Sequence, residues 1–118
     1  MADVVIYHNP RCSNSRTALA LLSARGETVE VVEYLKAPPD RQALEALVAA
    51  LEDDPAELVR HDNRFAELGL DPAGYTEAAA VVDLLLAHPE LMQRPVLVSA
   101  DRAIIGRPPA EKVPAFLD

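Results

Sequence analysis

The sequence contains only one cysteine, Cys12, no tryptophan and three histidines among its 118 residues. A single thiol cannot form a disulfide within the chain, and an unpaired thiol stays reduced most readily in the cytoplasm, where we expect the protein to be. One cysteine and three scattered histidines give no C-x-x-C or H-x-x-x-H spacing, so we expect no bound metal. Any chemistry of Cys12 must proceed without a second cysteine in the chain.

Basic residues are also scarce, since 11 lysines and arginines stand against 19 acidic residues and give a formal net charge of -8. Nucleic acids and anionic membranes attract clustered positive charge, so neither is an expected partner. The first residues show no basic segment followed by a long apolar one, and no run approaches about 18 apolar residues. The sequence therefore predicts neither a signal peptide nor a membrane span, and any anion site must be local.

Half of the residues are hydrophobic (50%), which is enough for one globular domain spanning residues 1–118. The run Val4–Tyr7 is short and β-branched, which predicts a buried strand, and Thr28–Tyr34 alternates as a second strand. Between them, Ser13–Arg25 has leucines at helical spacing before Gly26. This order predicts a βαβ unit with parallel strands.

The middle of the chain, about residues 38–89, shows apolar residues mostly at helical spacing. Asp40 is placed to cap a first helix and Thr76 to cap a later one, and a short helical turn is expected near Pro55. The polar stretch 61–75 predicts irregular backbone. We expect this region to be an insertion in the domain, because no linker composition bounds it.

The last part of the chain returns to strand patterns. "RPVLVSA" and "RAIIG" flank a turn around Ala100 and Asp101, which predicts an antiparallel hairpin, and a short helix follows at about 110–117. The predicted order is β-α-β, helices, then β-β-α, an α/β fold with a mixed four-stranded sheet. Its core would come from about residues 1–37 and 90–118.

The stretch "HNPRCSNSR" places Cys12 in the loop between the first strand and its helix. Free backbone N–H groups and the positive end of the helix dipole favour a thiolate there. His8, Arg11 and Arg16 can add positive charge, and such surroundings lower a cysteine pKa below its free value of about 8.5. Ser15 can donate a hydrogen bond to the thiolate or cap the helix. The alternatives are a buried, inert cysteine and a His8 that is merely a polar residue at a strand end.

Two features narrow the chemistry of Cys12. A tyrosine-phosphatase-like phosphate loop requires an arginine six residues after its cysteine, and this chain has Ala18 there. Thiol oxidoreductases usually carry a second cysteine three residues after the first, where this chain has Ser15. An oxidised Cys12 must therefore be resolved by a thiol from another molecule.

Four motifs, "YHNPRCSNSR", "LVR" ending at Arg60, "QRPVLV" at Arg94 and "IGRPP" at Arg107, resemble the glutaredoxin-coupled arsenate reductases of the ArsC family. The resemblance runs from about Val4 to Phe116, almost the whole chain. It implies a thioredoxin-like fold with an inserted helical segment, in agreement with the order of elements predicted above.

The resemblance also implies a catalytic site. Cys12 matches the family's nucleophile, and Arg60, Arg94 and Arg107 match three arginines that surround the substrate oxyanion. Guanidinium groups suit this role, because each can form charge-assisted, often bidentate bonds to arsenate.

Three further matches concern the surroundings of the thiol. His8 and Ser15 match family positions associated with lowering the thiol pKa, and the Arg94–Pro95 bond matches a cis-proline position beside the active site. These assignments rest on the resemblance.

The implied activity is the reduction of arsenate to arsenite through a thioarsenate adduct on Cys12, which glutathione and glutaredoxin resolve. No bound cofactor is expected, glutathione being a co-substrate, and we expect a monomer. Two alternatives stay open: a glutathione-dependent, reductase-like family member with another substrate, and a redox-sensing transcription regulator that binds RNA polymerase. Phosphate has nearly the shape and charge of arsenate, so the sequence does not rank these oxyanions.

Overall fold

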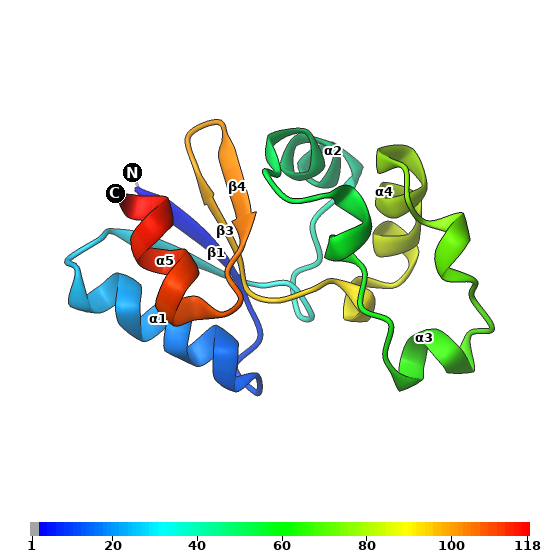
Figure 1. Ribbon diagram of the computed structural model, residues 1–118, viewed down its shortest axis with the longest axis horizontal. Coiled ribbons are helices and arrows are strands. Elements are labelled where there is room, and N and C mark those ends of the chain that lie inside the picture. The colour runs from blue at the N-terminus through cyan, green and yellow to red at the C-terminus, as the bar shows by residue number, and fades with distance from the viewer. Residues whose placement is uncertain (1–2) are drawn as a thin grey trace.

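The computed structural model describes residues 3–118, so the first two residues of the predicted domain lie outside it. Figure 1 shows a small sheet with α1 and α5 at one end of the molecule and a group of other helices at the opposite end. The predicted order β-α-β, helices, β-β-α is confirmed. The elements are, in chain order, β1 (Val4–His8), α1 (Ser13–Ala24), β2 (Val29–Glu33), α2 (Arg41–Ala50), η1 (Pro55–Leu58), α3 (Asn63–Glu67), η2 (Pro72–Gly74), α4 (Ala78–Ala87), η3 (Pro89–Leu91), β3 (Val96–Ser99), β4 (Arg102–Ile105) and α5 (Pro109–Leu117).

The strands form one mixed, 4-stranded sheet in the order β2-β1-β3-β4. β1 pairs in parallel with β2 and antiparallel with β3, and β3 pairs antiparallel with β4. A parallel pair requires a crossover connection, which α1 supplies. The hairpin between β3 and β4 turns at Ala100, which has a φ of 54°, and Asp101. The predicted α/β class, mixed sheet and hairpin are therefore confirmed.

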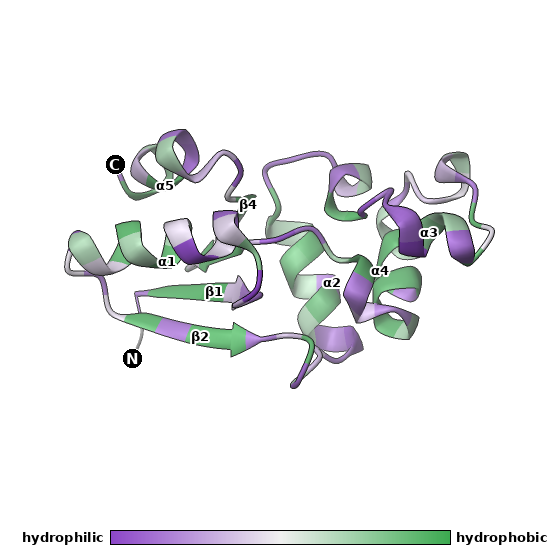
Figure 2. Cartoon of the chain, turned by 90° about the horizontal axis from the view of Figure 1, so that it is seen from below, coloured by the Kyte–Doolittle hydropathy of each residue, from purple (hydrophilic) through white to green (hydrophobic). Residues whose placement is uncertain are grey.

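One face of the sheet is covered by α1 and α5 (Figure 2). The residues of β1 are alternately buried and half-buried, because successive side chains of a strand point to opposite faces. Val4 and Ile6 therefore reach the same core as Leu22 of α1 and Phe116 of α5. This core fixes α1 against the sheet, and with α1 the loop that precedes it.

A second core joins the other face of the sheet to α2 and α4. α2 begins after Asp40, whose Oδ1 accepts a hydrogen bond from the backbone N–H of Ala43 at 2.9 Å, so the predicted cap is confirmed. The apolar positions of both helices recur at helical spacing and are buried together with residues of β3 and β4. The members of this core include Leu44, Leu47, Val81, Leu85, Val96 and Ile105.

Two details of the helical region differ from the prediction. The stretch 61–75 contains the short helix α3, because Asp62 accepts a hydrogen bond from the backbone N–H of Phe65 and the Phe65 side chain is buried. α4 has Glu77 at its N-cap position, so the prediction that Thr76 caps this helix is wrong. Neither difference changes the topology, which is set by the sheet.

Candidate functional site

Cys12 lies in the N-cap position of α1. β1 ends at His8, and the backbone N–H of Cys12 donates to the carbonyl oxygen of Asn9 at 3.0 Å, closing a tight turn between strand and helix. An N-cap side chain faces the free N–H groups of the first helical turn. In this helix the N–H groups of Asn14 and Ser15 face the thiol, so the positive end of α1 is directed at Cys12.

The pKa of the Cys12 thiol lies below its ordinary value. Burial by itself raises this pKa, but a hydrogen bond from the Arg94 side chain, the N–H groups of Ser15 and Asn14, and the charge of Arg94 outweigh burial. The residue is half-buried, so the alternative of a fully buried cysteine is wrong. Because the thiolate is the nucleophilic form, these surroundings favour a reactive Cys12.

Ser15 is fully buried and connects the end of β1 with α1. Its Oγ accepts a hydrogen bond from the backbone N–H of Asn9 at 3.0 Å and lies 2.6 Å from Nδ1 of His8. Because Oγ already accepts one hydrogen bond, its own hydrogen is free for the Nδ1 of a neutral imidazole. The hydroxyl group is thus directed at His8 and Asn9, while the group of Ser15 that faces the thiol is its backbone N–H.

His8 is uncharged near neutral pH. Burial lowers its pKa below the ordinary value of 6.5, Arg16 lowers it further, and Glu33 only partly opposes these effects. The prediction that His8 adds positive charge beside the thiol is therefore wrong at neutral pH. A catalytic part for His8 and Ser15 stays a prediction.

Arg11 and Arg16 are not the cations that lower the pKa of the thiol. Both side chains are exposed, and Nη1 of Arg16 donates to the carbonyl oxygen of Pro10 at 2.9 Å. The guanidinium group that reaches Cys12 belongs to Arg94. The charge at the thiol therefore comes from a distant part of the sequence.

Arg94 reaches the thiol because of the sheet pairing. It precedes β3, which lies beside β1 with Tyr7 opposite Val96. The chain entering β3 therefore runs next to the chain leaving β1 and its cysteine loop. The Arg94–Pro95 peptide bond is cis, so this expectation is confirmed.

Arg107 follows β4 and is held by three groups. Its Nη1 donates to Oε1 of Gln93 at 2.8 Å and to the carbonyl oxygen of Arg94 at 3.4 Å. When the amide oxygen of Asn14 faces the guanidinium group, it accepts from Nη2 at 2.9 Å and from Nε at 3.3 Å. Since the N–H of Asn14 also faces the thiol of Cys12, Asn14 links Arg107 to the site.

Arg60 lies on a neighbouring segment. Its backbone N–H donates to the carbonyl oxygen of Leu91 at 2.8 Å, so the chain around Arg60 runs beside the chain leading to β3. Its side chain is 25% exposed, and the guanidinium group pairs with Asp62, with 3.3 Å between Nη1 and Oδ2. The structure therefore brings Arg94 to the thiol directly and Arg107 indirectly, while Arg60 is held by an acidic side chain.

Three amide side chains that organise the site were not predicted from the sequence. Oδ1 of Asn9 accepts a hydrogen bond from the backbone N–H of Arg11 at 3.0 Å and so orders the cysteine loop. Asn14 and Gln93 hold Arg107. Each of the three lies inside or next to a motif that carried the resemblance, and this position was the available signal.

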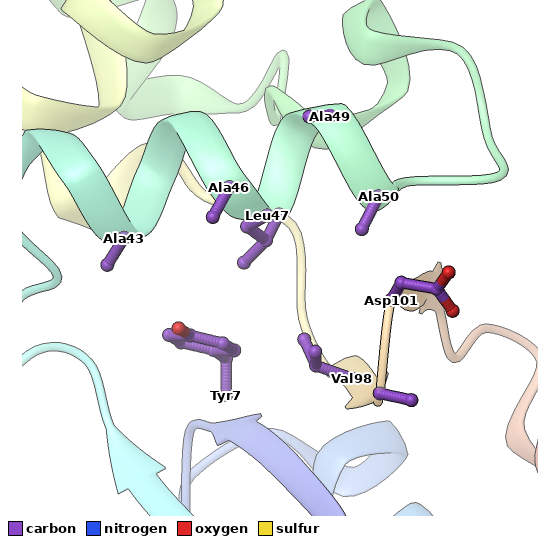
Figure 3. Close-up of a pocket in the computed structure, with 9 residues that line it drawn as sticks. Tyr7, Ala43, Ala46, Leu47, Ala49, Ala50, Val98 and Asp101 are labelled. Atoms are coloured by element: carbon purple, nitrogen blue, oxygen red, sulfur yellow. The ribbon is translucent and has the colours of Figure 1, made fainter.

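A hollow of about 580 Å³ opens beside Arg107 and is lined also by Gln93, Glu57, His61 and Lys112. Another hollow, of about 500 Å³, lies between α2 and the sheet and is lined mainly by apolar side chains (Figure 3). None of the predicted site residues lines this second hollow. Of the predicted site residues, only Arg107 lines the first hollow, and Cys12 lines neither.

The site combines a cysteine whose pKa is lowered with guanidinium groups, in a chain of net charge -8. This arrangement can bind a tetrahedral oxyanion and present its central atom to a nucleophilic sulfur. Within residues 3–118, no group of three or more histidine, cysteine, aspartate or glutamate side chains could hold a metal ion. In the same range, no helix is long and apolar enough to cross a membrane.

Comparisons with known proteins agree with this geometry. The model of the ArsC family matches residues 7–114. An arsenate reductase of Neisseria meningitidis is 39% identical over 99% of this chain and 100% of its own length. The uncharacterized protein YfgD of Escherichia coli is 42% identical over 92% of each chain.

Solved structures show the same architecture. The structure of an arsenate reductase from Vibrio cholerae matches 96% of this chain and 97% of its own, with a TM-score of 0.81 and 33% identity. The predicted thioredoxin-like fold is therefore confirmed.

Proposed function

The chain belongs to the ArsC family, and from this premise we propose that it reduces arsenate to arsenite with Cys12 as the nucleophile. The observation that carries the proposal is the position of Cys12 at the N-cap of α1, where the Arg94 side chain lowers the pKa of the thiol. It joins a reactive sulfur to a cation suited to an oxyanion.

The arginines reduce the electrostatic repulsion between arsenate and the site. Arsenate carries about two negative charges near neutral pH, and both a thiolate and an acidic protein repel it. Arg94 and Arg107 stand at the cysteine loop and can neutralise this charge locally. Arg60 joins them in the proposal by releasing Asp62, because a doubly charged oxyanion is the stronger partner for a guanidinium group.

In the first chemical step, the Cys12 thiolate attacks arsenic(V). A sulfur–arsenic bond forms and one arsenic–oxygen bond breaks, with the oxygen leaving as hydroxide or water, so the adduct is a Cys12 thioarsenate. Arsenic is not yet reduced at this point. The N–H groups of Asn14 and Ser15 and the Arg94 side chain then stabilise the cysteine sulfur whenever it is released as a thiolate.

The electrons come from outside thiols, because the chain has a single cysteine. In the proposed cycle, glutathione replaces a second oxygen on arsenic, which leaves as water. A glutaredoxin thiolate then attacks the glutathione sulfur and forms a mixed disulfide, while the electron pair of the broken sulfur–arsenic bond stays on arsenic and reduces it to arsenic(III). Water cleaves the remaining Cys12–arsenic bond and releases arsenite. The cytoplasm, where glutathione is abundant, suits this cycle.

The test is NADPH consumption by the purified protein with arsenate, glutathione, glutaredoxin and glutathione reductase. Arsenate-dependent oxidation is expected in the wild type and not in Cys12→Ser, whose fold should be intact by circular dichroism. Wild-type protein alkylated at Cys12 is a second inactive form with an unchanged sequence. Full activity of Cys12→Ser would remove Cys12 from the mechanism.

The thiol donor is tested in the same system. Replacing glutathione and glutaredoxin by thioredoxin and its reductase separates the two ways of supplying electrons. Arsenite formation only with thioredoxin would keep the nucleophile and reject the proposed donor.

A second candidate function is favoured by one comparison. YfgD, whose name states no activity, is 42% identical to this chain, so a reductase acting on another substrate is a candidate within the same family. A glutathione-dependent disulfide reductase would consume NADPH with a mixed disulfide of glutathione and no arsenate. Turnover of that substrate together with no response to arsenate would favour this candidate.

A further inference from the structure

Most basic side chains of this chain pair with acidic ones, and the exceptions gather in one place. Seven of the 11 lysines and arginines pair with a carboxylate. The four that pair with no carboxylate of residues 3–118 are Arg11, Arg16, Arg94 and Arg107. Arg11 and Arg16 flank Cys12 in the sequence, and Arg94 and Arg107 belong to the candidate site. The cations without an acidic partner therefore all lie around the cysteine loop.

The acidic residues have the opposite distribution. Although the chain contains 19 of them, residues 4–26 contain none, and neither do residues 91–100 and 102–110. The first of these segments forms β1, the cysteine loop and α1, and the other two carry Arg94 and Arg107. A chain of net charge -8 thus has a positively charged region where its only thiol lies.

Arg11 and Arg16 lie on the exposed surface of the cysteine loop. Both side chains are exposed, and Figure 1 shows the loop between β1 and α1 at the margin of the molecule. The backbone N–H of Arg11 donates to Oδ1 of Asn9 at 3.0 Å, and Nη1 of Arg16 donates to the carbonyl oxygen of Pro10 at 2.9 Å. The loop is therefore ordered on both sides of Arg11, and the Arg16 guanidinium group rests against it. Two accessible positive charges stand beside Cys12.

These two arginines have no part in the site as described so far. Arg94 is the cation that lowers the pKa of the thiol, and neither Arg11 nor Arg16 lines either of the two hollows. Glu33, which β2 places at the end of the sheet, is itself paired with Lys36. Exposed arginines outside a cavity suit the broad surface of another protein better than a small ligand, and arginine is enriched at protein interfaces.

We propose that Arg11 and Arg16 form a docking surface for a protein that carries its reactive thiol among acidic side chains. Because the chain has one cysteine, a thiol from another molecule must restore Cys12 after reaction, and that thiol must approach the cysteine loop. Complementary charge speeds and orients such an approach. The remainder of an acidic chain repels an acidic partner, which directs the partner to this loop. The inference rests on the proposed function only where it takes Cys12 as the residue that an outside thiol restores.

The test measures how charge affects the reaction of Cys12 with a sulfur partner. Two short cysteine peptides, one flanked by glutamates and the other by lysines, are activated as mixed disulfides with thiopyridine. The Cys12 thiolate attacks the peptide sulfur, a disulfide forms between Cys12 and the peptide, and thiopyridone leaves with the electron pair of the broken bond and is measured by its absorbance. Arsenate takes no part, so arsenate reduction can fail while the docking role stands, and the reverse is also measurable.

In Arg11→Gln/Arg16→Gln, the rate with the acidic peptide divided by the rate with the basic peptide should fall about three- to tenfold at low ionic strength. This ratio cancels any change in the reactivity of the thiol itself. The matched control is Arg25→Gln/Arg41→Gln, which removes the same charge from two exposed arginines that pair with carboxylates away from the loop. In the control the ratio should change by less than about twofold.

Two results would overturn the proposal. One is a ratio in Arg11→Gln/Arg16→Gln that equals the wild-type ratio, and the other is an equal fall in the control, because net charge alone would then explain it. At about 1 M salt, where the Debye length is about 3 Å, the wild-type and variant ratios should converge. A difference that persists there would also count against a docking surface built on charge. Circular dichroism verifies that the compared proteins are folded.

Discussion

Oγ of Ser15 lies 2.6 Å from Nδ1 of His8, and both side chains are buried. This contact joins the last residue of β1 to the first turn of α1, on either side of the loop that carries Cys12. The backbone N–H of Asn9 donates to the same Oγ at 3.0 Å. The geometry of the reactive loop is therefore fixed by a hydroxyl group that the sequence offered only as a ligand of the thiol or a helix cap.

The first prediction concerns this hydroxyl group. Ser15→Ala leaves the N–H of Asn9 and Nδ1 of His8 without their partner, and should lower the free energy of unfolding by about 1–3 kcal/mol. The measurement is urea-induced unfolding. The matched control is Ser23→Ala, on an exposed position of the same helix, where a change within about 0.5 kcal/mol is expected. Equal stability of the two variants would contradict the role given to Ser15.

The second prediction concerns pH. Burial lowers the pKa of His8 below 6.5 in the folded chain. As the pH falls through the ordinary histidine value, the unfolded chain takes up a proton that the folded chain does not, so the folded state loses stability. This loss begins near pH 6.5 and continues down to the lower, folded-state pKa.

The measurement compares the urea midpoints of wild type and His8→Gln from about pH 7.5 to about pH 5. Any stability advantage of the wild type should shrink toward acid pH, because only the wild type must protonate a buried imidazole. His61→Gln, which removes an exposed imidazole, controls for the loss of a histidine as such. A difference between wild type and His8→Gln that is the same at every pH would refute the prediction.

The third prediction concerns which arginine lowers the pKa of the Cys12 thiol. Arg94→Ala removes the side-chain hydrogen bond and the charge that lower the pKa of Cys12, so the pH profile of Cys12 alkylation should move to higher pH. The expected decrease in rate below the wild-type midpoint is about tenfold. Arg11→Ala, an exposed arginine next to the cysteine, should leave the profile unchanged. The assignment fails if Arg11→Ala has the larger effect.

The fourth prediction concerns Arg60. If its guanidinium group leaves Asp62 for the oxyanion, Arg60→Ala should lower kcat/KM for arsenate about tenfold or more, mainly through KM. The matched control is Arg64→Ala, a nearby arginine whose Nε bonds to Glu90 at 3.0 Å on the surface. Steady-state kinetics with varied arsenate make the comparison. Unchanged kinetics in Arg60→Ala would exclude it from the oxyanion site.

The sequence predicted the order of elements well, because the relevant signals are local. The short β-branched run of β1, the helical spacing in α2 and the cap at Asp40 each depend on neighbouring residues. Prediction failed where a short side chain decided a boundary. Asp62 starts α3 in a stretch that looked irregular, and its effect depends on burial of Phe65 by distant parts of the chain.

The site, like the fold, was predicted only in part from the sequence. The motifs identified Cys12 and three arginines, but the charges assigned to the thiol from the adjacent sequence were the wrong ones. Arg16 is near in sequence and directed at Pro10, whereas Arg94 is far in sequence and directed at the thiol. Proximity in the sequence was a poor guide, because arginine is long and its direction depends on the contacts available to it.

The sequence by itself determined that one thiol stands at the start of a helix, where free N–H groups and the helix dipole favour a thiolate, because these effects arise within a single turn. Only the tertiary structure decided which cation completes the site. The pairing of β1 with β3 brings the chain of Arg94 beside the cysteine loop, where Arg94 lowers the pKa of Cys12. Such contacts depend on strand register, which is fixed by burying one face of the whole sheet and not by any local stretch of residues.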